Sequence, residues 1–214
     1  MSLALIIGNK NYSSWSLRAW LAMAQAGLEF EEVRIPLSRP ESKQQILRYS
    51  PSGKVPCLID DGLTIFDSLA ICEYVNERYA GGRLWPRDPV ARARARAVVA
   101  EMHSGFVALR TYMSMDIRAS DAERGAAAQR REDVAADVAR IKWVWNECLA
   151  GGGPWLFGEF SIADACYAPV VTRFATYGVA LPGPLTAYSD RVLALPAMQR
   201  WITAARTEVE TIDA

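Results

Sequence analysis

The feature that most constrains the fold is a change in hydrophobic pattern near Pro86. Before it, short apolar runs alternate with amphipathic segments, whereas only helical periodicity follows it. Alternating strands and helices are typical of a layered sheet domain, and successive helices are typical of a bundle. The sequence therefore predicts an α+β protein with a first domain over 1–82, a linker over 83–88 and an all-helical domain over 89–214.

The first domain contains signals for four strands and three helices. Asp61-Gly62 between two apolar runs is a strong hairpin signal, and Gly27 ends the first helical pattern. The predicted strands cover 3–7, 30–35, 55–59 and 63–66, and the predicted helices cover 15–26, 41–49 and 69–79. The resulting order is β-α-β-α-β-β-α.

The second domain begins where Asp88 can cap a helix that has Pro89 at its first position. Two apolar stripes at helical spacing predict two long helices joined by a turn over 120–125. The stripes are Val99, Met102, Phe106, Leu109 and Met113, then Val134, Val138, Ile141, Trp145 and Leu149. Ser161 and Asp164 have the spacing of a capping box and predict a helix to Tyr177, followed by short helices over 185–194 and 197–209.

Composition excludes several classes of protein. The chain has as many Lys and Arg residues as Asp and Glu residues, so it lacks the excess of basic residues that is typical of a nucleic-acid binder. No apolar run approaches the length of about 18 residues that a membrane span needs, and no leader peptide is recognisable, so we expect a cytoplasmic protein. The chain has one histidine, His103, and no nucleotide-binding glycine motif. We expect no metal site.

The four cysteines are not spaced as a redox pair or a zinc knuckle. Each lies in an apolar stretch, which predicts small buried side chains. They are Cys57, Cys72, Cys148 and Cys166.

Three motifs give the chain a family resemblance. The first is Ser-Ser-Trp-Ser-Leu-Arg at 13–18, the second is Ser-Pro-Ser-Gly-Lys-Val-Pro-Cys-Leu at 50–58, and the third is Phe-Asp-Ser-Leu-Ala-Ile at 66–71. In this order, with a β-α-β-α-β-β-α unit before a helical domain, the whole chain resembles the cytosolic glutathione transferases. The first motif is similar to that of the zeta class, a serine-type class. The resemblance implies a thioredoxin-like first domain and glutathione as co-substrate.

The second and third motifs indicate how glutathione would bind. In the family, the peptide pairs with the backbone of the residue before a cis proline, which here is Val55 before Pro56. Asp67 and Ser68 lie at the start of a predicted helix, whose free N–H groups suit the γ-glutamyl carboxylate, while Asp67 can accept from the ammonium group. Lys54 either meets the glycyl carboxylate or is a solvated loop residue.

By resemblance, Ser13 is the catalytic residue, with Ser14 as the alternative and the Tyr12 hydroxyl as a further option. The thiolate is the nucleophile, and a free thiol titrates near about 8.5. A hydroxyl hydrogen bond to a charged acceptor contributes about 1.5–3 kcal/mol, and a helix N-terminus adds up to about 1–2 kcal/mol. These two contributions suffice without a general base, although either serine could simply cap the helix.

The family's second-substrate pocket lies between the domains and would admit a small hydrophobic electrophile. Its predicted lining here is Tyr12, Met102, Phe106, Arg110 and Met113, although this stripe could equally be bundle core. Arg110 either binds an anionic substrate or faces solvent. Trp15 and Leu17 depart from the zeta pattern, so maleylacetoacetate isomerase activity does not follow.

The resemblance thus implies a glutathione transferase, or a related glutathione-dependent isomerase or peroxidase, that works as a homodimer in detoxification. The alternative is a non-catalytic protein of the same fold that serves as an interaction or regulatory partner, as bacterial stringent-starvation proteins do. The set formed by Ser13, Val55-Pro56 and Asp67-Ser68 favours the enzyme, because a non-catalytic relative need not keep it.

Overall fold

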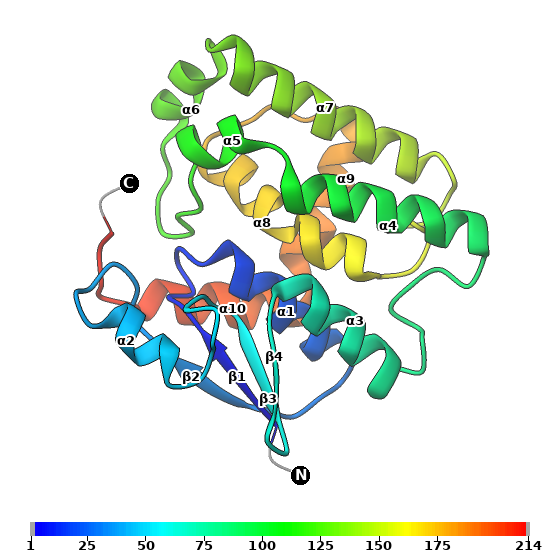
Figure 1. Ribbon diagram of the computed structural model, residues 1–214. Coiled ribbons are helices and arrows are strands. Elements are labelled where there is room, and N and C mark those ends of the chain that lie inside the picture. Colours follow the sequence, from blue (N-terminus) through cyan, green and yellow to red (C-terminus); the bar gives the residue numbers. More distant parts are fainter. Residues whose placement is uncertain (1–2, 213–214) are drawn as a thin grey trace.

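The computed structural model describes residues 3–212 and has a four-stranded sheet domain beneath a layer of helices (Figure 1). The first seven elements are β1 (Leu3–Ile7), α1 (Ser14–Gln25), β2 (Glu31–Arg34), α2 (Ser42–Leu47), β3 (Cys57–Asp60), β4 (Leu63–Ile65) and α3 (Ser68–Arg78). The predicted order of these elements is confirmed. The predicted domains also include residues 1–2 and 213–214, which lie outside the described residues.

The sheet has the strand order β2-β1-β3-β4, with β1 parallel to β2 and antiparallel to β3. Side chains alternate between its two faces. Leu5, Ile7 and Leu58 belong to the large core that includes α1 and α3, whereas Ile6 and Cys57 belong to a smaller cluster that includes α2. The sheet is therefore covered on both faces, which confirms the thioredoxin-like fold.

The remaining elements are all helical. They are α4 (Pro89–Ser104), α5 (Val107–Tyr112), α6 (Ala122–Gln129), α7 (Glu132–Leu149), α8 (Ile162–Thr176), α9 (Gly183–Ala194) and α10 (Pro196–Thr207). Helix α8 is buried along nearly its whole length and packs against α1, α4 and α9. It lies between the sheet domain and the outer helices, and it brings the two parts of the chain together (Figure 1).

Helix caps occur where the sequence predicts them. Asp88 accepts from the Ala91 N–H at 2.7 Å, with Pro89 in the first turn of α4. The capping box of α8 is complete, because Ser161 accepts from the helix backbone and the Asp164 carboxylate accepts from the Ser161 N–H at 2.8 Å. Burial raises the pKa of Asp164 to about 6.

Two predictions about the helical domain are wrong. The first stripe does not form one helix, because Gly105 ends α4 in extended backbone and Phe106 adopts a left-handed conformation with φ of 58° before α5. The predicted turn over 120–125 is largely helical, because Asp121 caps α6. Gly125 fits inside this helix because a Cβ there would lie 1.9 Å from the Tyr177 carbonyl oxygen.

The prediction that the cysteines are buried is confirmed, and all four are free thiols. Burial raises the pKa of each of them, to about 11 for Cys148 and Cys166. These thiols are therefore protonated at neutral pH and structural in character.

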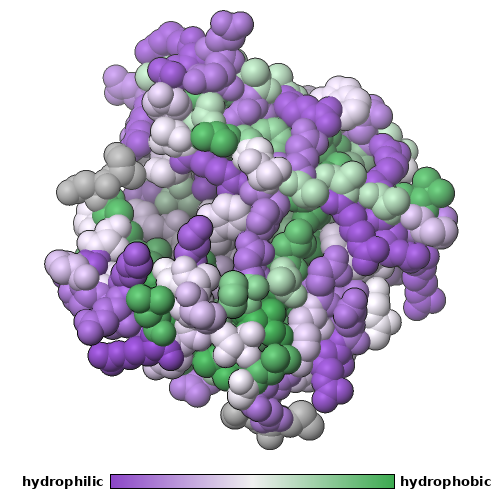
Figure 2. Space-filling model, in the orientation of Figure 1, coloured by the Kyte–Doolittle hydropathy of each residue, from purple (hydrophilic) through white to green (hydrophobic). Residues whose placement is uncertain are grey.

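The outer surface is mixed in polarity. Figure 2 shows hydrophilic side chains over the α6–α7 end and apolar side chains gathered near the β4 edge of the sheet. Leu63 and Phe66 at that edge are 52% and 44% exposed. Within residues 3–212, no helix is both long enough and apolar enough to cross a bilayer.

Candidate functional site

Two cavities share a wall at the start of α1. The first, of about 490 Å³, is lined by Trp15, Ser52, Lys54, Val55, Pro56, Phe66, Asp67, Ser68 and His103. The second, of about 520 Å³, is lined by Tyr12, Ser13, Ser14, Trp15, Leu37, Ser38, Ile46, Gly53, Lys54, Val55, Arg110, Ser114, Met115, Arg173 and Ile212. Residues from both parts of the chain thus contribute to each cavity.

The first cavity brings together five of the seven residues predicted to bind glutathione, namely Lys54, Val55, Pro56, Asp67 and Ser68. The other two, Ser13 and Ser14, line the second cavity. The Val55-Pro56 bond is cis, as predicted. Among the described residues, no hydrogen bond occupies the Val55 N–H or C=O, so both remain available to an extended peptide. Pro56 has no N–H to donate and lies just before β3, beyond the last residue pair that joins β3 to β4, which is Leu58 with Ile65.

The start of α3 forms the opposite side of this cavity. Asp67, rather than Ser68, is the cap, and its Oδ1 accepts from the Leu69 N–H at 2.8 Å. Ser68 is 2% exposed, and its hydroxyl has no hydrogen-bond partner among the described residues. A free hydroxyl and a helix N-terminus suit a carboxylate, while the half-exposed Asp67 suits an ammonium group.

His103 is a residue of this cavity that sequence reasoning did not select. Its Nε2 lies 3.2 Å from Asp67 Oδ2, and its ring packs edge-on against Trp15 with 5.0 Å between centroids. The pairing arises because the last turn of α4 lies beside the start of α3. Nothing local in the sequence indicates that approach.

The two candidate serines both line the second cavity but differ in their partners. Ser13 caps α1, accepts from the Ser16 N–H at 3.4 Å and donates its hydroxyl to Ser16 Oγ at 2.7 Å. Ser16 Oγ also accepts from the Gly8 N–H at 3.1 Å. Ser14 is the first residue of α1, and its hydroxyl has no partner among the described residues.

The predicted second-substrate residues divide into two groups. Tyr12 and Arg110 line the second cavity. The other three residues lie in the hydrophobic core and line neither cavity, as the alternative of bundle core predicts. They are Met102, Phe106 and Met113. Met115 and Arg173 line this cavity instead, and sequence reasoning missed both.

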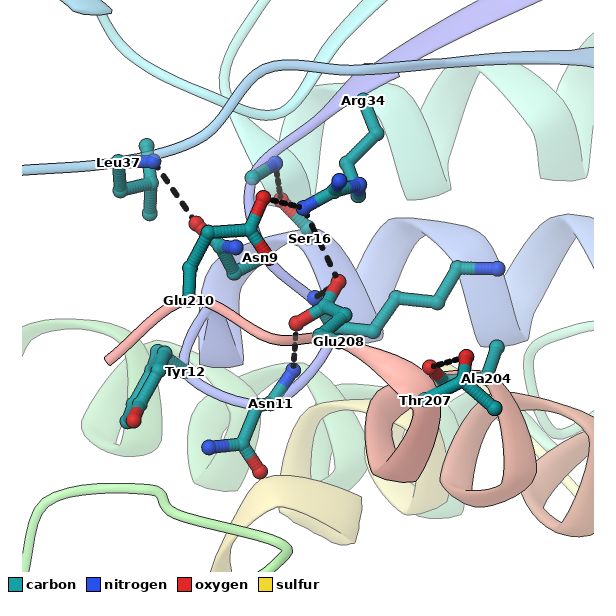
Figure 3. Close-up of polar contacts among 12 residues, drawn as sticks. Asn9, Asn11, Tyr12, Ser16, Arg34, Leu37, Ala204, Thr207, Glu208 and Glu210 are labelled. Atoms are coloured by element: carbon teal, nitrogen blue, oxygen red, sulfur yellow. Dashed lines mark hydrogen bonds and ion pairs between the residues drawn. The ribbon is translucent and has the colours of Figure 1, made fainter. Parts of the chain in front are cut away.

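The loop before Ser13 is held by the C-terminal segment (Figure 3). The Glu208 carboxylate accepts from the N–H groups of Lys10 at 2.7 Å and Asn11 at 3.1 Å. Arg118 donates to the carbonyl oxygens of Glu208 and Glu210 and to the Tyr12 hydroxyl. Residues near the end of the chain therefore position the loop that carries the serines.

We expect Glu208→Ala to lower kcat/KM for a glutathione-dependent reaction roughly fivefold, or about 1 kcal/mol, because two loop N–H groups lose a charged acceptor. Hydrogen exchange over residues 10–13 should speed up. Glu210→Ala is the matched control, because among the described residues the Glu210 side chain pairs with Arg34, at 2.8 Å, and accepts from no N–H group of this loop. Equal effects of the two substitutions would contradict this role for Glu208.

The described residues contain no group of three His, Cys, Asp or Glu side chains that could hold a metal ion. The polar groups that line the two cavities are instead hydroxyls, guanidiniums, one carboxylate, one lysine and one imidazole. These groups suit a zwitterionic peptide and a second, anionic or polar molecule.

Comparisons with known proteins show which family the chain resembles over most of its length. The chain matches the sequence profiles of the glutathione S-transferase N-terminal domain over residues 12–78 and C-terminal domain over 125–204. It is 30% identical to a maleylacetoacetate isomerase of Rattus norvegicus over 193 residues, which is 87% of each chain. It is 29% identical to a stringent starvation protein A homologue of Pasteurella multocida over 179 residues, or 80% and 77% of the two chains.

Solved structures extend the likeness to the fold. A glutathione transferase homologue from Burkholderia GL BGR1 with bound glutathione is 25% identical, with a TM-score of 0.74, and the match covers 97% of this chain and 100% of that one. The two matched profiles, the long match to the rat isomerase and the paired cavities at the start of α1 all lead to the same conclusion. The chain belongs to the glutathione S-transferase family.

Proposed function

We propose that the protein binds glutathione in the first cavity and activates its thiol for attack on a small electrophile in the second. The observation that carries this proposal is the convergence of Val55-Pro56, Asp67-Ser68 and the two serines on cavities that share the Trp15 wall. The relative named as a maleylacetoacetate isomerase supports a glutathione-dependent reaction, whether conjugation or isomerisation.

Each end of glutathione has a complementary group. The γ-glutamyl carboxylate would accept from the Ser68 hydroxyl and the free N–H groups of α3, and its ammonium would donate to Asp67. The cysteinyl backbone would pair with Val55. Lys54, which is exposed and lines both cavities, would meet the glycyl carboxylate.

The thiolate would accept from Ser13. Hydroxyl hydrogens rotate freely, so Ser16 can donate to Ser13 Oγ while Ser13 donates to sulfur, with no heavy atom moved. The Gly8 N–H continues to donate to Ser16 Oγ. The hydrogen bonds then run from the Gly8 N–H to Ser16, from Ser16 to Ser13, and from Ser13 to the sulfur, as a continuous chain of donors. Donors in such a chain polarise one another, which strengthens the last hydrogen bond.

Assembly and location follow from the family resemblance. We infer that two copies form a homodimer in the cytoplasm, with the first domain of one copy against the helical domain of the other.

Glutathione binding can be measured by calorimetry with wild type and Asp67→Asn. We expect wild type to bind glutathione about tenfold more tightly than the variant, or about 1.4 kcal/mol, because the variant lacks the charge that accepts from the ammonium. Cysteinylglycine, which lacks the γ-glutamyl group, should bind both proteins equally weakly. Asp88→Asn is the matched control, because Asp88 caps α4 outside both cavities.

An assay with glutathione and an activated aryl halide separates the enzyme from a binding module. Saturable thioether formation supports the proposed function. Tight glutathione binding without turnover of any electrophile would instead indicate a non-catalytic protein of this fold. Absence of glutathione binding in wild type would overturn the proposal altogether.

A further inference from the structure

Two arginines lie over the Trp15 ring, a third lines the same cavity as one of them, and none of the three has a carboxylate partner among the described residues. Arg18 and Arg110 have their guanidinium carbons 4.3 Å and 4.7 Å from the ring centroid. Arg173, on α8, lines the same cavity as Arg110. Among the described residues, the ion pairs within 4.0 Å do not include any of the three.

All three side chains are withdrawn from solvent to different degrees. Arg18 is 0% exposed, and its three guanidinium nitrogens have no hydrogen-bond partner within residues 3–212. Arg173 is 4% exposed. Burial lowers the pKa of all three, to about 10 for Arg110 and about 9 for Arg173, and repulsion from Arg18 adds to the effect on both. They remain cationic at neutral pH, and a buried cation without a partner is costly.

Backbone carbonyls hold two of these arginines in place. Arg110 Nε donates to the Gly105 carbonyl at 2.9 Å, and its Nη2 donates to the Met102 carbonyl. Arg173 donates through Nε to the Met113 carbonyl at 3.0 Å and through Nη1 to the Pro169 carbonyl at 3.2 Å. The carbonyls that hold Arg110 lie at the break between α4 and α5, and those that hold Arg173 come from residues 113 and 169. Both guanidiniums are therefore held in place by the protein's own backbone.

Each fixed guanidinium keeps one free edge. Arg110 Nη1 is buried with no partner, and Arg173 Nη2 has no hydrogen bond among the described residues. Asp137 attracts Arg110 and Asp67 attracts Arg18, but neither carboxylate lies within ion-pair distance of the arginine. A planar anion such as a carboxylate matches free guanidinium edges, because each edge can donate to one of its oxygens.

The wall of the second cavity indicates which molecule supplies that anion. The groups suited to glutathione at Asp67, Ser68 and Pro56 line only the first cavity, whereas Arg110 and Arg173 line only the second. Ser13 lines the second cavity with them. A molecule held by the arginines therefore lies beside the sulfur that Ser13 would hold.

We propose that the electrophile carries a carboxylate, which Arg110 and Arg173 bind in the second cavity. This inference rests on the proposed function and makes the predicted electrophile more specific, with Arg110 binding an anionic group rather than facing solvent. The carboxylate neutralises a cluster that the protein leaves unpaired, and the apolar part of the electrophile packs against Trp15 and Met115.

Two glutathione conjugates test the proposal as a matched pair. S-(para-carboxybenzyl)glutathione carries the anion, and S-(para-methylbenzyl)glutathione has nearly the same shape without it. We expect wild type to bind the carboxylate conjugate about 30-fold more tightly, or about 2 kcal/mol. Arg110→Gln should reduce this preference to roughly threefold or less while leaving the affinity for unmodified glutathione unchanged, and Arg110→Lys should restore part of it.

The outcomes separate this inference from the proposed function. Equal binding of the two conjugates by wild type would overturn the anion site even where unmodified glutathione binds, and this comparison needs no variant to fold. A parallel loss of affinity for unmodified glutathione in Arg110→Gln would show that the arginine serves glutathione itself, which also overturns the proposal. Failure of wild type to bind glutathione at all would reject the proposed function first.

Discussion

We expect Ser13→Ala to lower kcat/KM for thioether formation about 30-fold at neutral pH, or about 2 kcal/mol. The substitution removes the last donor of the chain that runs from the Gly8 N–H through Ser16. A hydroxyl bond to a charged acceptor contributes about 1.5–3 kcal/mol, which sets the size of the effect. The difference in kcat/KM between wild type and the variant should shrink as pH rises towards about 9. The thiol of free glutathione has a pKa of about 8.5, so at that pH it ionises without a hydrogen bond from the protein.

Ser14→Ala is the matched control for this substitution. Ser14 lines the same cavity, but its hydroxyl has no place in the donor chain. We expect a change of no more than about threefold, or about 0.7 kcal/mol. A large loss in Ser14→Ala together with a small loss in Ser13→Ala would assign the sulfur to Ser14 instead.

The second large effect concerns stability, and we expect Asp164→Ala to lower the free energy of unfolding by about 3–5 kcal/mol. The buried carboxylate accepts from the Leu156 N–H at 3.1 Å, the Ser161 N–H at 2.8 Å and the Ser161 hydroxyl at 3.0 Å. Alanine leaves two buried N–H groups without partners, at about 1–3 kcal/mol each, and opens a cavity at the start of α8. Urea unfolding followed by circular dichroism measures the change.

Two further substitutions make the stability test specific. Ser161→Ala removes one cap but leaves the Asp164 carboxylate on its backbone donors, so it should lower the free energy of unfolding by about 1 kcal/mol.

The pH dependence of stability gives a further test. Because the pKa of Asp164 is raised in the folded state, to about 6, protonation favours folding, and this contribution is lost as pH rises through that value. Asp164→Asn does not titrate, so the stability gap between wild type and this variant should widen as pH falls from about 7 to 5. Equal losses in Ser161→Ala and Asp164→Ala would contradict the account.

Most of the fold could be predicted because local signals were strong and mutually consistent. The run Leu3–Ile7 is the first strand with the predicted bounds, Asp61-Gly62 joins two strands, and Ser161 opens α8. The error at Gly105 arose because Phe106 continues the apolar stripe of α4 in sequence while its backbone leaves the helix. Periodicity records which side chains are apolar, but it does not record where the helix breaks.

The candidate site was only partly predictable, for a related reason. Residues of the glutathione cavity follow one another in short motifs, so Val55-Pro56 and Asp67-Ser68 could be selected from the sequence. Three other residues of the site come from distant parts of the chain and reach it only through tertiary packing. Arg173 lines the cavity of the two serines, His103 pairs with Asp67, and Glu208 binds the loop before Ser13. In the sequence, Arg18 and Arg173 are indistinguishable from exposed arginines on a helix surface. Only the structure shows that both side chains are buried without a carboxylate beside them.

The ionisation of bound glutathione tests the central claim most directly. Ultraviolet difference absorbance of the thiolate should be followed from about pH 5 to 9 in wild type saturated with glutathione, with Ser13→Ala in parallel. We expect a thiolate band whose apparent pKa lies about two units below the free value of about 8.5 in wild type and near that value in the variant. A bound thiol in wild type that ionises no more readily than free glutathione would contradict the account.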